Sequence, residues 1–215
     1  MPVRLIAFAC ALVAASAHAA ENFPARPVRL LVPQAAGGSN DIMARSAANF
    51  LTAHFGRQFV VDNRPGAEGI IGTEIVARSA PDGYTLLLAS AAFTMNPAVK
   101  KLPYDPLRDF QWVAKLGAGP TVLTVGPLLP ASSVKDILAI AKARPGEITM
   151  ATAGGFQHFG CALFKSLAKL DVTILLYKGG GPAMIDVMGG QAHMTIGSII
   201  QTVPHIRSGK LKPLA

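Results

Sequence analysis

Short apolar runs alternate along this chain with longer stretches in which apolar side chains recur at helical spacing. Strands are predicted at Val28–Val32, Gln58–Asn63 and Thr85–Ala89. The third run shows no apolar–polar alternation, which is typical of a strand buried on both faces. Between these runs, Asn40–Phe55 and Ile70–Arg78 have the helical pattern. Strands and helices in this order predict an α/β fold with a parallel sheet.

A region of different character follows. Residues Ser90–Asp109 carry several prolines in an irregular pattern, so we expect them to form the crossing into a second lobe. Beyond it, strands are predicted at Trp112–Leu116, Thr121–Val125, Ile148–Ala151, Thr173–Leu176, His193–Ile196 and Leu211–Ala215. Helices are predicted from Ser132 or Ser133 to Ala143, and at Phe156–Leu170, Ala183–Met188 and Val203–Ser208. The expected organisation is a first lobe over residues 21–120, a second lobe over 121–211, and the start of a return to the first lobe at 212–215.

Three loops share one arrangement, in which small residues follow a strand and precede a helix: Ala35–Asp41, Thr152–Gln157 and Tyr177–Pro182. Glycine allows a ligand to approach the backbone closely. The free N–H groups of a helix's first turn attract carboxylates and phosphates. Because ligands of open α/β sheets lie beyond the carboxyl ends of the strands, two such lobes would form a clamp. The alternative for each loop is an ordinary capped turn between a strand and a helix.

The first twenty residues have the features of a secretory signal peptide. Arg4 supplies the short positive segment, Leu5–Ala15 is apolar, and Ala17–Ala19 is a cleavage site of the small-x-small type. Cleavage leaves Cys161 as the only cysteine, which excludes an internal disulfide. We therefore expect a soluble mature chain in a bacterial periplasm.

The formal net charge of +8 does not indicate a nucleic-acid-binding protein. Lys and Arg are scattered, with Lys100–Lys101 as the one adjacent pair, and they form no run interleaved with aromatic residues. A basic surface of this kind favours solubility and mild steering of acidic solutes.

Several separate segments of the chain together resemble the Bug family. They read VRLLVPQAAGGSNDIMAR, QFVVDNRPGAEGIIGTEIVARSAPDGYTLLLAS, KLPYDPLRDF and YKGGGPAMIDVMGGQ, in the family's order, and the resemblance runs from about Pro27 to Ala215. Bug proteins are the extracytoplasmic solute receptors of tripartite tricarboxylate transporters. The resemblance implies a two-lobed periplasmic-binding-protein (Venus flytrap) fold that closes on a small organic acid and delivers it to the membrane subunits of a transporter. It also implies that the chain stops where family members return to the first lobe, so that the first lobe is expected to be incomplete.

The resemblance further implies which residues contact the ligand. They lie after the first and third strands of the first lobe, in the two glycine loops of the second lobe, and after the last strand of that lobe. The expected first-lobe residues are Gln34, Ala36, Gly37, Gly38, Ser39, Asn40, Asp41, Ser90, Ala91, Phe93 and Thr94. The expected second-lobe residues are Thr152, Gly154, Gln157, His158, Tyr177, Lys178, Gly179 and Ser198. In this chain the Thr152–His158 loop looks shorter than the usual family form.

Side chains in these loops keep more than one interpretation. Asp41 could stabilise the dipole of the following helix, or it could orient a ligand amine or a water. Phe93 and Tyr177 could wall a pocket or belong to the core, and Lys178 could pair with a ligand carboxylate or only face solvent. His158 and Cys161 are three residues apart on a predicted helix, but no other pair of Cys or His residues has the spacing that would complete a zinc site. His158 is therefore expected to donate a hydrogen bond or to cap a helix.

The chain lacks the usual signatures of catalysis. It has no Gly-x-Ser-x-Gly elbow and no Walker loop. Gly66, Gly69 and Gly72 do not form the dinucleotide-binding motif. They lie past a strand in a helical pattern, and their spacing indicates close helix packing. We therefore expect a receptor, without cofactor or metal, for a dicarboxylate, tricarboxylate, amino acid or aromatic acid held by backbone N–H groups. The alternatives are an exported α/β enzyme acting on an acidic substrate and a non-functional truncated remnant of the receptor.

Overall fold

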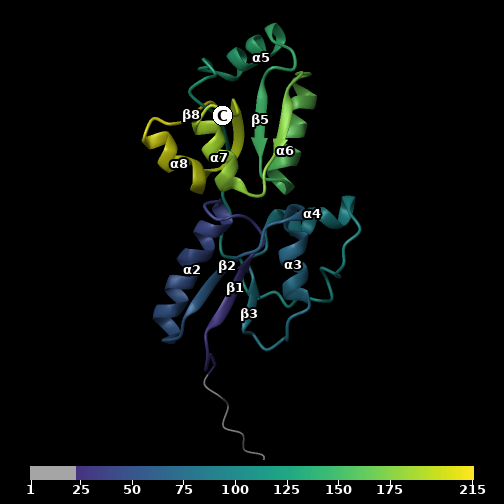
Figure 1. Ribbon diagram of the computed structural model, residues 1–215, viewed down its shortest axis with the longest axis vertical. Coiled ribbons are helices and arrows are strands. Elements are labelled where there is room, and N and C mark those ends of the chain that lie inside the picture. The colour runs from purple at the N-terminus through teal and green to yellow at the C-terminus, as the bar shows by residue number, and fades with distance from the viewer. Residues whose placement is uncertain (1–22) are drawn as a thin grey trace, which may run out of the picture.

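The computed structural model describes residues 23–215 and arranges them as two lobes, one above the other, each built on its own sheet (Figure 1). The two-lobed α/β architecture expected from the sequence is therefore confirmed. The expected signal peptide, residues 1–20, lies outside the described residues.

The first lobe is organised around a three-stranded parallel sheet in the order β2–β1–β3. Its elements are β1 (Val28–Val32), α2 (Ser39–Phe55), β2 (Phe59–Asn63), the 3₁₀ turn η1 (Ala67–Gly69), α3 (Ile70–Ala77), β3 (Thr85–Leu87) and α4 (Ala91–Val99). In the central strand β1, Leu30 lies opposite Val61 on one side and Leu86 on the other. The helices α2 and α3 flank this strand (Figure 1), so four of its five side chains are buried and apolar.

The second lobe contains a five-stranded mixed sheet in the order β6–β5–β7–β4–β8. Its elements are β4 (Thr121–Val125), α5 (Val134–Ala143), β5 (Thr149–Thr152), α6 (Gly155–Leu167), β6 (Thr173–Leu176), α7 (Gly180–Met188), β7 (Met194–Ser198), α8 (Ile199–Arg207) and β8 (Lys212–Pro213). Strand β5 runs parallel to β6 and β7, whereas β4 runs antiparallel to β7 and β8. Fully buried Met150, Met194 and Ile137 contribute to its core. The lobe boundaries given above stay predictions.

A side-chain cap explains where α5 begins. The Oγ atom of Ser133 accepts a hydrogen bond from the backbone N–H of Asp136 at 3.2 Å, so Ser133 is the cap of α5. Helices α7 and α8 begin at Gly180 and Ile199, earlier than the sequence pattern predicted. The glycine loop before α7 therefore supplies the first helical turn itself.

The expectation that Ser90–Asp109 is irregular is wrong, because α4 lies within it. Ser90 caps this helix: its Oγ atom accepts a hydrogen bond from the backbone N–H of Ala92 at 3.3 Å. Of the prolines that suggested irregularity, Pro97 is accommodated inside the helix, and the others lie beyond its end.

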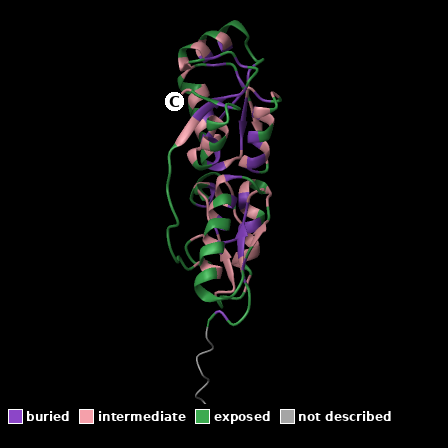
Figure 2. Cartoon of the chain, turned by 90° about the vertical axis from the view of Figure 1, so that its left-hand side faces the viewer, coloured by how far each residue is buried: buried purple, intermediate pink, exposed green. Residues whose placement is uncertain are grey.

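The predicted strand at Trp112–Leu116 is also wrong. Residues 111–120 form an exposed connection without regular structure, which runs along the outside of the molecule from one lobe to the other (Figure 2). The ring of Trp112 packs edge-on against Phe93 at a centroid distance of 5.4 Å. This apolar side chain is thus anchored by an aromatic contact and not by a sheet.

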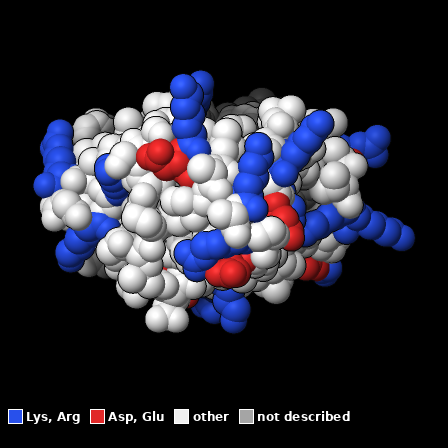
Figure 3. All heavy atoms as spheres, turned by 90° about the horizontal axis from the view of Figure 1, so that it is seen from above, with Lys and Arg blue, Asp and Glu red and all other residues white. Residues whose placement is uncertain are grey.

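The surface carries its positive charge in scattered form. Viewed from above, Lys and Arg side chains point outward in several directions with Asp and Glu between them (Figure 3). On this face, the positive charge is thus as scattered as it is along the sequence. Of the helices in residues 23–215, none combines the length and the apolar character needed to cross a membrane.

Candidate ligand-binding site

A cavity of about 200 Å³ lies between the two lobes. From the first lobe it is lined by Pro33, Gln34, Gly66, Ala67, Glu68 and Gly69, and from the second by Ala153, Leu176, Tyr177 and Lys178. Each of these segments follows or ends a parallel strand, namely β1, β2, β5 and β6. The cavity therefore occupies the position at which open α/β sheets bind ligands. Its volume is below the roughly 300–1,000 Å³ typical of pockets for drug-sized ligands, so it suits a small molecule.

Glycines bring the backbones of the two lobes into direct contact beside this cavity. The backbone N–H of Ala35 donates to the carbonyl oxygen of Lys178 across the interface at 3.2 Å. A Cβ atom on Gly38 would lie 3.4 Å from the backbone nitrogen of Gly180, and one on Gly179 would lie 2.8 Å from the nitrogen of Ala35. Two of the predicted glycine loops thus face each other, and their small residues permit the close approach.

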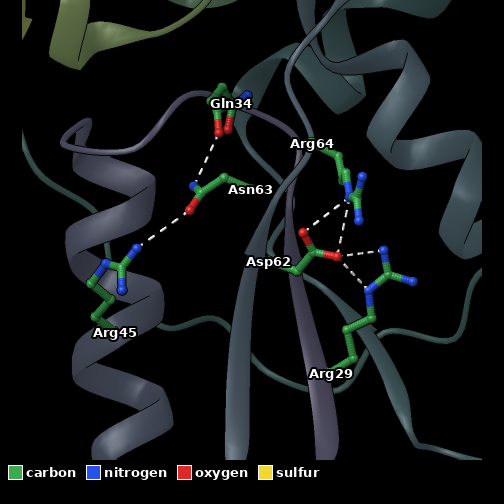
Figure 4. A network of polar contacts seen from close by, with 6 residues as sticks. All are labelled: Arg29, Gln34, Arg45, Asp62, Asn63 and Arg64. Atoms are coloured by element: carbon green, nitrogen blue, oxygen red, sulfur yellow. Dashed lines mark hydrogen bonds and ion pairs between the residues drawn. The ribbon is translucent and has the colours of Figure 1, made fainter.

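A polar network fixes the first-lobe loop that follows β1. Gln34 donates from Nε2 to Oγ of Ser90 at 3.0 Å, and its Oε1 accepts from Nδ2 of Asn40 at 2.8 Å. Asn63, at the end of β2, donates from Nδ2 to the backbone oxygen of Gln34 at 3.1 Å and accepts from Arg45 at 3.4 Å (Figure 4). The network joins the ends of β1 and β2 to the starts of α2 and α4, and so holds Gln34 at the cavity.

Beside this network, Asp62 joins β1 to β2 (Figure 4). Its carboxylate accepts from Nε of Arg29 at 2.7 Å and pairs with Nε of Arg64 at 3.0 Å. Burial alone would raise the pKa of Asp62, but these two guanidinium groups hold it below the usual range. The contacts fix the end of β2 from which the cavity-lining Gly66–Gly69 segment departs.

The carboxylate of Asp41 binds the backbone of the glycine loop that precedes α2. It is 4% exposed, and its Oδ2 atom accepts hydrogen bonds from the backbone N–H of Gly37 and from Nε of Arg45, both at 3.0 Å. Burial alone would raise the pKa of Asp41, but the hydrogen bond from Arg45 and that from Gly37 lower it below the usual range. The N–H group of Gly37, expected to face a ligand, is therefore committed to Asp41, which favours the structural interpretation of this carboxylate.

Glu68 is a cavity residue that the sequence interpretation missed. Its Oε1 atom pairs with Nζ of Lys100 at 2.5 Å, and its Oε2 atom accepts a hydrogen bond from the backbone N–H of Gly155, in the other lobe, at 3.4 Å. The hydrogen bond from Lys100 is the main cause that lowers the pKa of Glu68, against the effect of burial. The first turn of α6 is therefore already approached by an anionic group of the protein itself.

Tyr177 and Lys178 form the second-lobe wall of the cavity together with Ala153. The Tyr177 hydroxyl donates to Oδ2 of Asp186 at 2.7 Å. Burial and this hydrogen bond raise the pKa of Tyr177 to about 12, so its phenol is neutral at physiological pH. The Lys178 side chain, exposed at the mouth of the site, is the cationic group that lines the cavity.

The predicted site residues fall into groups. Gln34, Tyr177 and Lys178 line the cavity. The other predicted residues in and beside the glycine loops are not among the lining residues. The loop before α2 and the start of that helix contain Ala36, Gly37, Gly38, Ser39, Asn40 and Asp41, and the end of β5, the N-cap and first turn of α6 and the loop before α7 contain Thr152, Gly154, Gln157, His158 and Gly179. Ser90, Ala91, Phe93 and Thr94 belong to α4 and its cap, and Ser198 is the residue that directly precedes α8. Within the described residues, no three His, Cys, Asp or Glu side chains are grouped to hold a metal ion.

Phe93 illustrates a predicted pocket residue that the structure places in the core. Its side chain is 5% exposed and contacts the rings of Tyr104, Phe110 and Trp112 at centroid distances of 6.2, 5.1 and 5.4 Å. This aromatic cluster packs α4 against the segment that leads to the second lobe.

Comparison with known proteins identifies the family to which this two-lobed arrangement belongs. The family described as Tripartite tricarboxylate transporter family receptor matches residues 43–215. The chain belongs to this family. The resemblance to Bug proteins is therefore confirmed. Among this receptor family's curated members, BugT of Bordetella pertussis is 40% identical over 91% of this chain and 62% of its own length.

Solved structures of receptor-family relatives have the same fold. A protein of R. palustris, solved with adipate, is 34% identical with a TM-score of 0.86, over 90% of this chain and 66% of that protein. MatC from Rhodopseudomonas palustris, solved with bound malate, is 30% identical with a TM-score of 0.80, over 90% of this chain and 67% of MatC. The chain thus spans 62% to 67% of the length of these three relatives.

Proposed function

We propose that this chain is a periplasmic solute-binding receptor that captures a small carboxylate-bearing molecule between its lobes for a tripartite tricarboxylate-type transporter. The observation that carries the proposal is the interlobe cavity, because both lobes line it with segments that leave the carboxyl ends of parallel strands. The family membership and two relatives solved with organic acids, adipate and malate, support the same ligand class.

The ligand carboxylate is proposed to lie beside Lys178 and Gln34. Lys178 is the cationic side chain of the lining, and Gln34 is held in place by Ser90 and Asn40. Two backbone N–H groups in the stretches that the sequence suggested as donors bind carboxylates of the protein instead. That of Gly37 binds Asp41, and that of Gly155 binds Glu68 of the facing lobe. Side chains, together with bridging water, would then supply much of the recognition.

The groups that line the cavity suit binding better than bond chemistry. The Tyr177 phenol is a poor nucleophile or base at neutral pH because its pKa is raised to about 12. The thiol of Cys161 is fully buried away from the lining, and burial raises its pKa. Release of the unchanged acid to a membrane subunit requires no catalyst, and secretion by the predicted signal peptide would place the receptor in the periplasm.

A thermal-shift panel with product analysis tests this function. The purified chain is heated with dicarboxylates, tricarboxylates, amino acids and aromatic acids, and each mixture is then examined by NMR. We expect at least one acid to raise the melting temperature while its spectrum stays that of the starting compound. Formation of a product would support the enzyme alternative, and the failure of every acid to stabilise a folded chain would contradict the receptor proposal.

A further inference from the structure

Glu68 is held in an unusual backbone conformation at the cavity wall. Its φ and ψ angles of 56° and 35° lie in the left-handed region, which residues other than glycine rarely adopt. The backbone oxygen of Glu68 accepts a hydrogen bond from Nδ2 of Asn96 at 3.3 Å, and its carboxylate binds Lys100 and Gly155. Contacts from two other elements, α4 with its C-cap residue Lys100 and the start of α6, thus hold the backbone and the side chain of Glu68. A strained backbone fixed in this way is common at ligand sites.

Only one member of the Glu68–Lys100 ion pair belongs to the cavity lining. Glu68 lines the cavity, whereas its partner Lys100 does not. The lowered pKa of Glu68 keeps its carboxylate ionised at neutral pH. On the opposite lobe, Lys178 lines the same cavity with a positive charge. The two lobes therefore offer groups of opposite sign to one small ligand.

We propose that Glu68 selects the class of ligand: an acid whose carboxylate lies on the Lys178 side and whose other end carries an amino group beside Glu68. A diacid would bring its second carboxylate against the carboxylate of Glu68, and such like-charge juxtaposition disfavours binding. An ammonium group at this end would instead be attracted to Glu68 and could donate hydrogen bonds to it. This inference rests on the proposed receptor function.

Matched ligand pairs measure the selection directly. Adipate and ε-aminocaproate have chains of similar length but differ at one end, carboxylate against ammonium, and succinate and γ-aminobutyrate form a shorter pair. Isothermal titration calorimetry would compare the wild-type chain with Glu68→Gln, which keeps the shape and removes the charge. The control is Glu74→Gln, the same change on α3, in an exposed ion pair with Arg78 outside the cavity lining.

We expect the wild-type chain to bind the amino acid of the better-fitting pair at least about tenfold more tightly than the diacid, the ratio given by a modest electrostatic preference. Glu68→Gln should reduce that ratio about tenfold or reverse it, and Glu74→Gln should leave it unchanged. A ratio within one protein cancels any general effect of the variant on lobe closure. If Glu68→Gln does not fold, Glu68→Gly repeats the test with a residue suited to the left-handed conformation.

Two results would overturn the inference. The first is that the wild-type chain prefers the diacid and that Glu68→Gln has the same preference; the inference would then be wrong, although the receptor function would stand. Binding of neither pair, with binding of another carboxylate from the panel, would also reject the selectivity alone. Binding of no acid at all by the folded chain would contradict the receptor function and this inference together.

Discussion

The contact between the glycine loops makes Gly179→Ala a test of lobe closure. Gly179 is buried at the interface, and its φ of 171° is an extended conformation that alanine adopts freely, so each lobe should fold normally. A Cβ atom there would lie 2.8 Å from the backbone nitrogen and 2.9 Å from the Cβ atom of Ala35, on the facing lobe. The lobes must separate by about 0.6 Å to restore the 3.4 Å at which ordinary van der Waals contact begins. That separation also stretches the hydrogen bond from Ala35 to Lys178.

Forcing one extra methyl group into a tightly packed contact costs about 1–3 kcal/mol, which corresponds to an affinity roughly 5- to 150-fold weaker when only the closed form holds the ligand. Isothermal titration calorimetry with the tightest-binding acid of the panel measures the affinity, and thermal unfolding followed by circular dichroism checks the fold. The matched control is Gly160→Ala in α6, whose added Cβ would come no closer than 3.9 Å to Ile196 of its own lobe. Wild-type affinity in a normally folded Gly179→Ala chain would refute the reasoning.

Three further predictions concern single side chains. Asp41→Asn should destabilise the chain by roughly 1–3 kcal/mol at neutral pH, because a buried charged acceptor is lost. Since the folded-state pKa of Asp41 is lowered, this difference in unfolding free energy, measured by urea unfolding, should shrink as the pH falls below 3.8. Glu74→Gln, in an exposed ion pair, should show neither the destabilisation nor its pH dependence. A difference for Asp41→Asn that does not change with pH would contradict a stabilising role for the ionised carboxylate. Because burial and the hydrogen bond to Asp186 raise the pKa of Tyr177 from 10 to about 12, wild-type stability should decline across that interval more than that of Tyr177→Phe. Equal declines would contradict a raised pKa of Tyr177. Phe93→Leu should lower the melting temperature and leave ligand affinity unchanged, whereas an affinity loss at unchanged stability would place Phe93 against the ligand.

Much of the fold could be predicted because its signals are local. The runs Val28–Val32, Thr121–Val125 and Thr173–Leu176 are strands with the bounds that the apolar pattern gave. Buried strands, glycine breaks and helix caps each act over a few residues, so a single sequence contains them. The same signals located the loops at the carboxyl ends of β1, β5 and β6, which border the cavity.

Elements that depend on distant contacts could not be predicted in this way. Proline in the sequence of α4 suggested irregularity, but Ser90 caps the helix and buried Phe93 anchors it in an aromatic cluster. The apolar residues of Trp112–Leu116 resembled a strand in the sequence, but Trp112 packs against Phe93 of that cluster. In both segments tertiary packing outweighed the local pattern.

The site shows the same division between local and distant information. Tyr177 and Lys178 could be proposed because they begin a glycine loop that follows a strand, and Gln34 was implied by the family resemblance; all three line the cavity. Glu68 could not, because its role depends on Lys100, 32 residues away, and on Gly155, 87 residues away. The segment containing Glu68 indicated close packing, which Gly72 confirms: a Cβ atom there would lie 2.7 Å from the backbone oxygen of Arg64.

Capture of an unchanged acid between the lobes can be measured most directly by an amide NMR titration of the chain with the tightest-binding acid of the panel. The backbone amides of Gln34, Glu68, Ala153 and Lys178, two from each lobe, should shift together along one binding curve, and the resonances of the acid should show no new compound. Shifts confined to one lobe, shifts centred on α5 or β8 far from the cavity, or product resonances would contradict capture at this site.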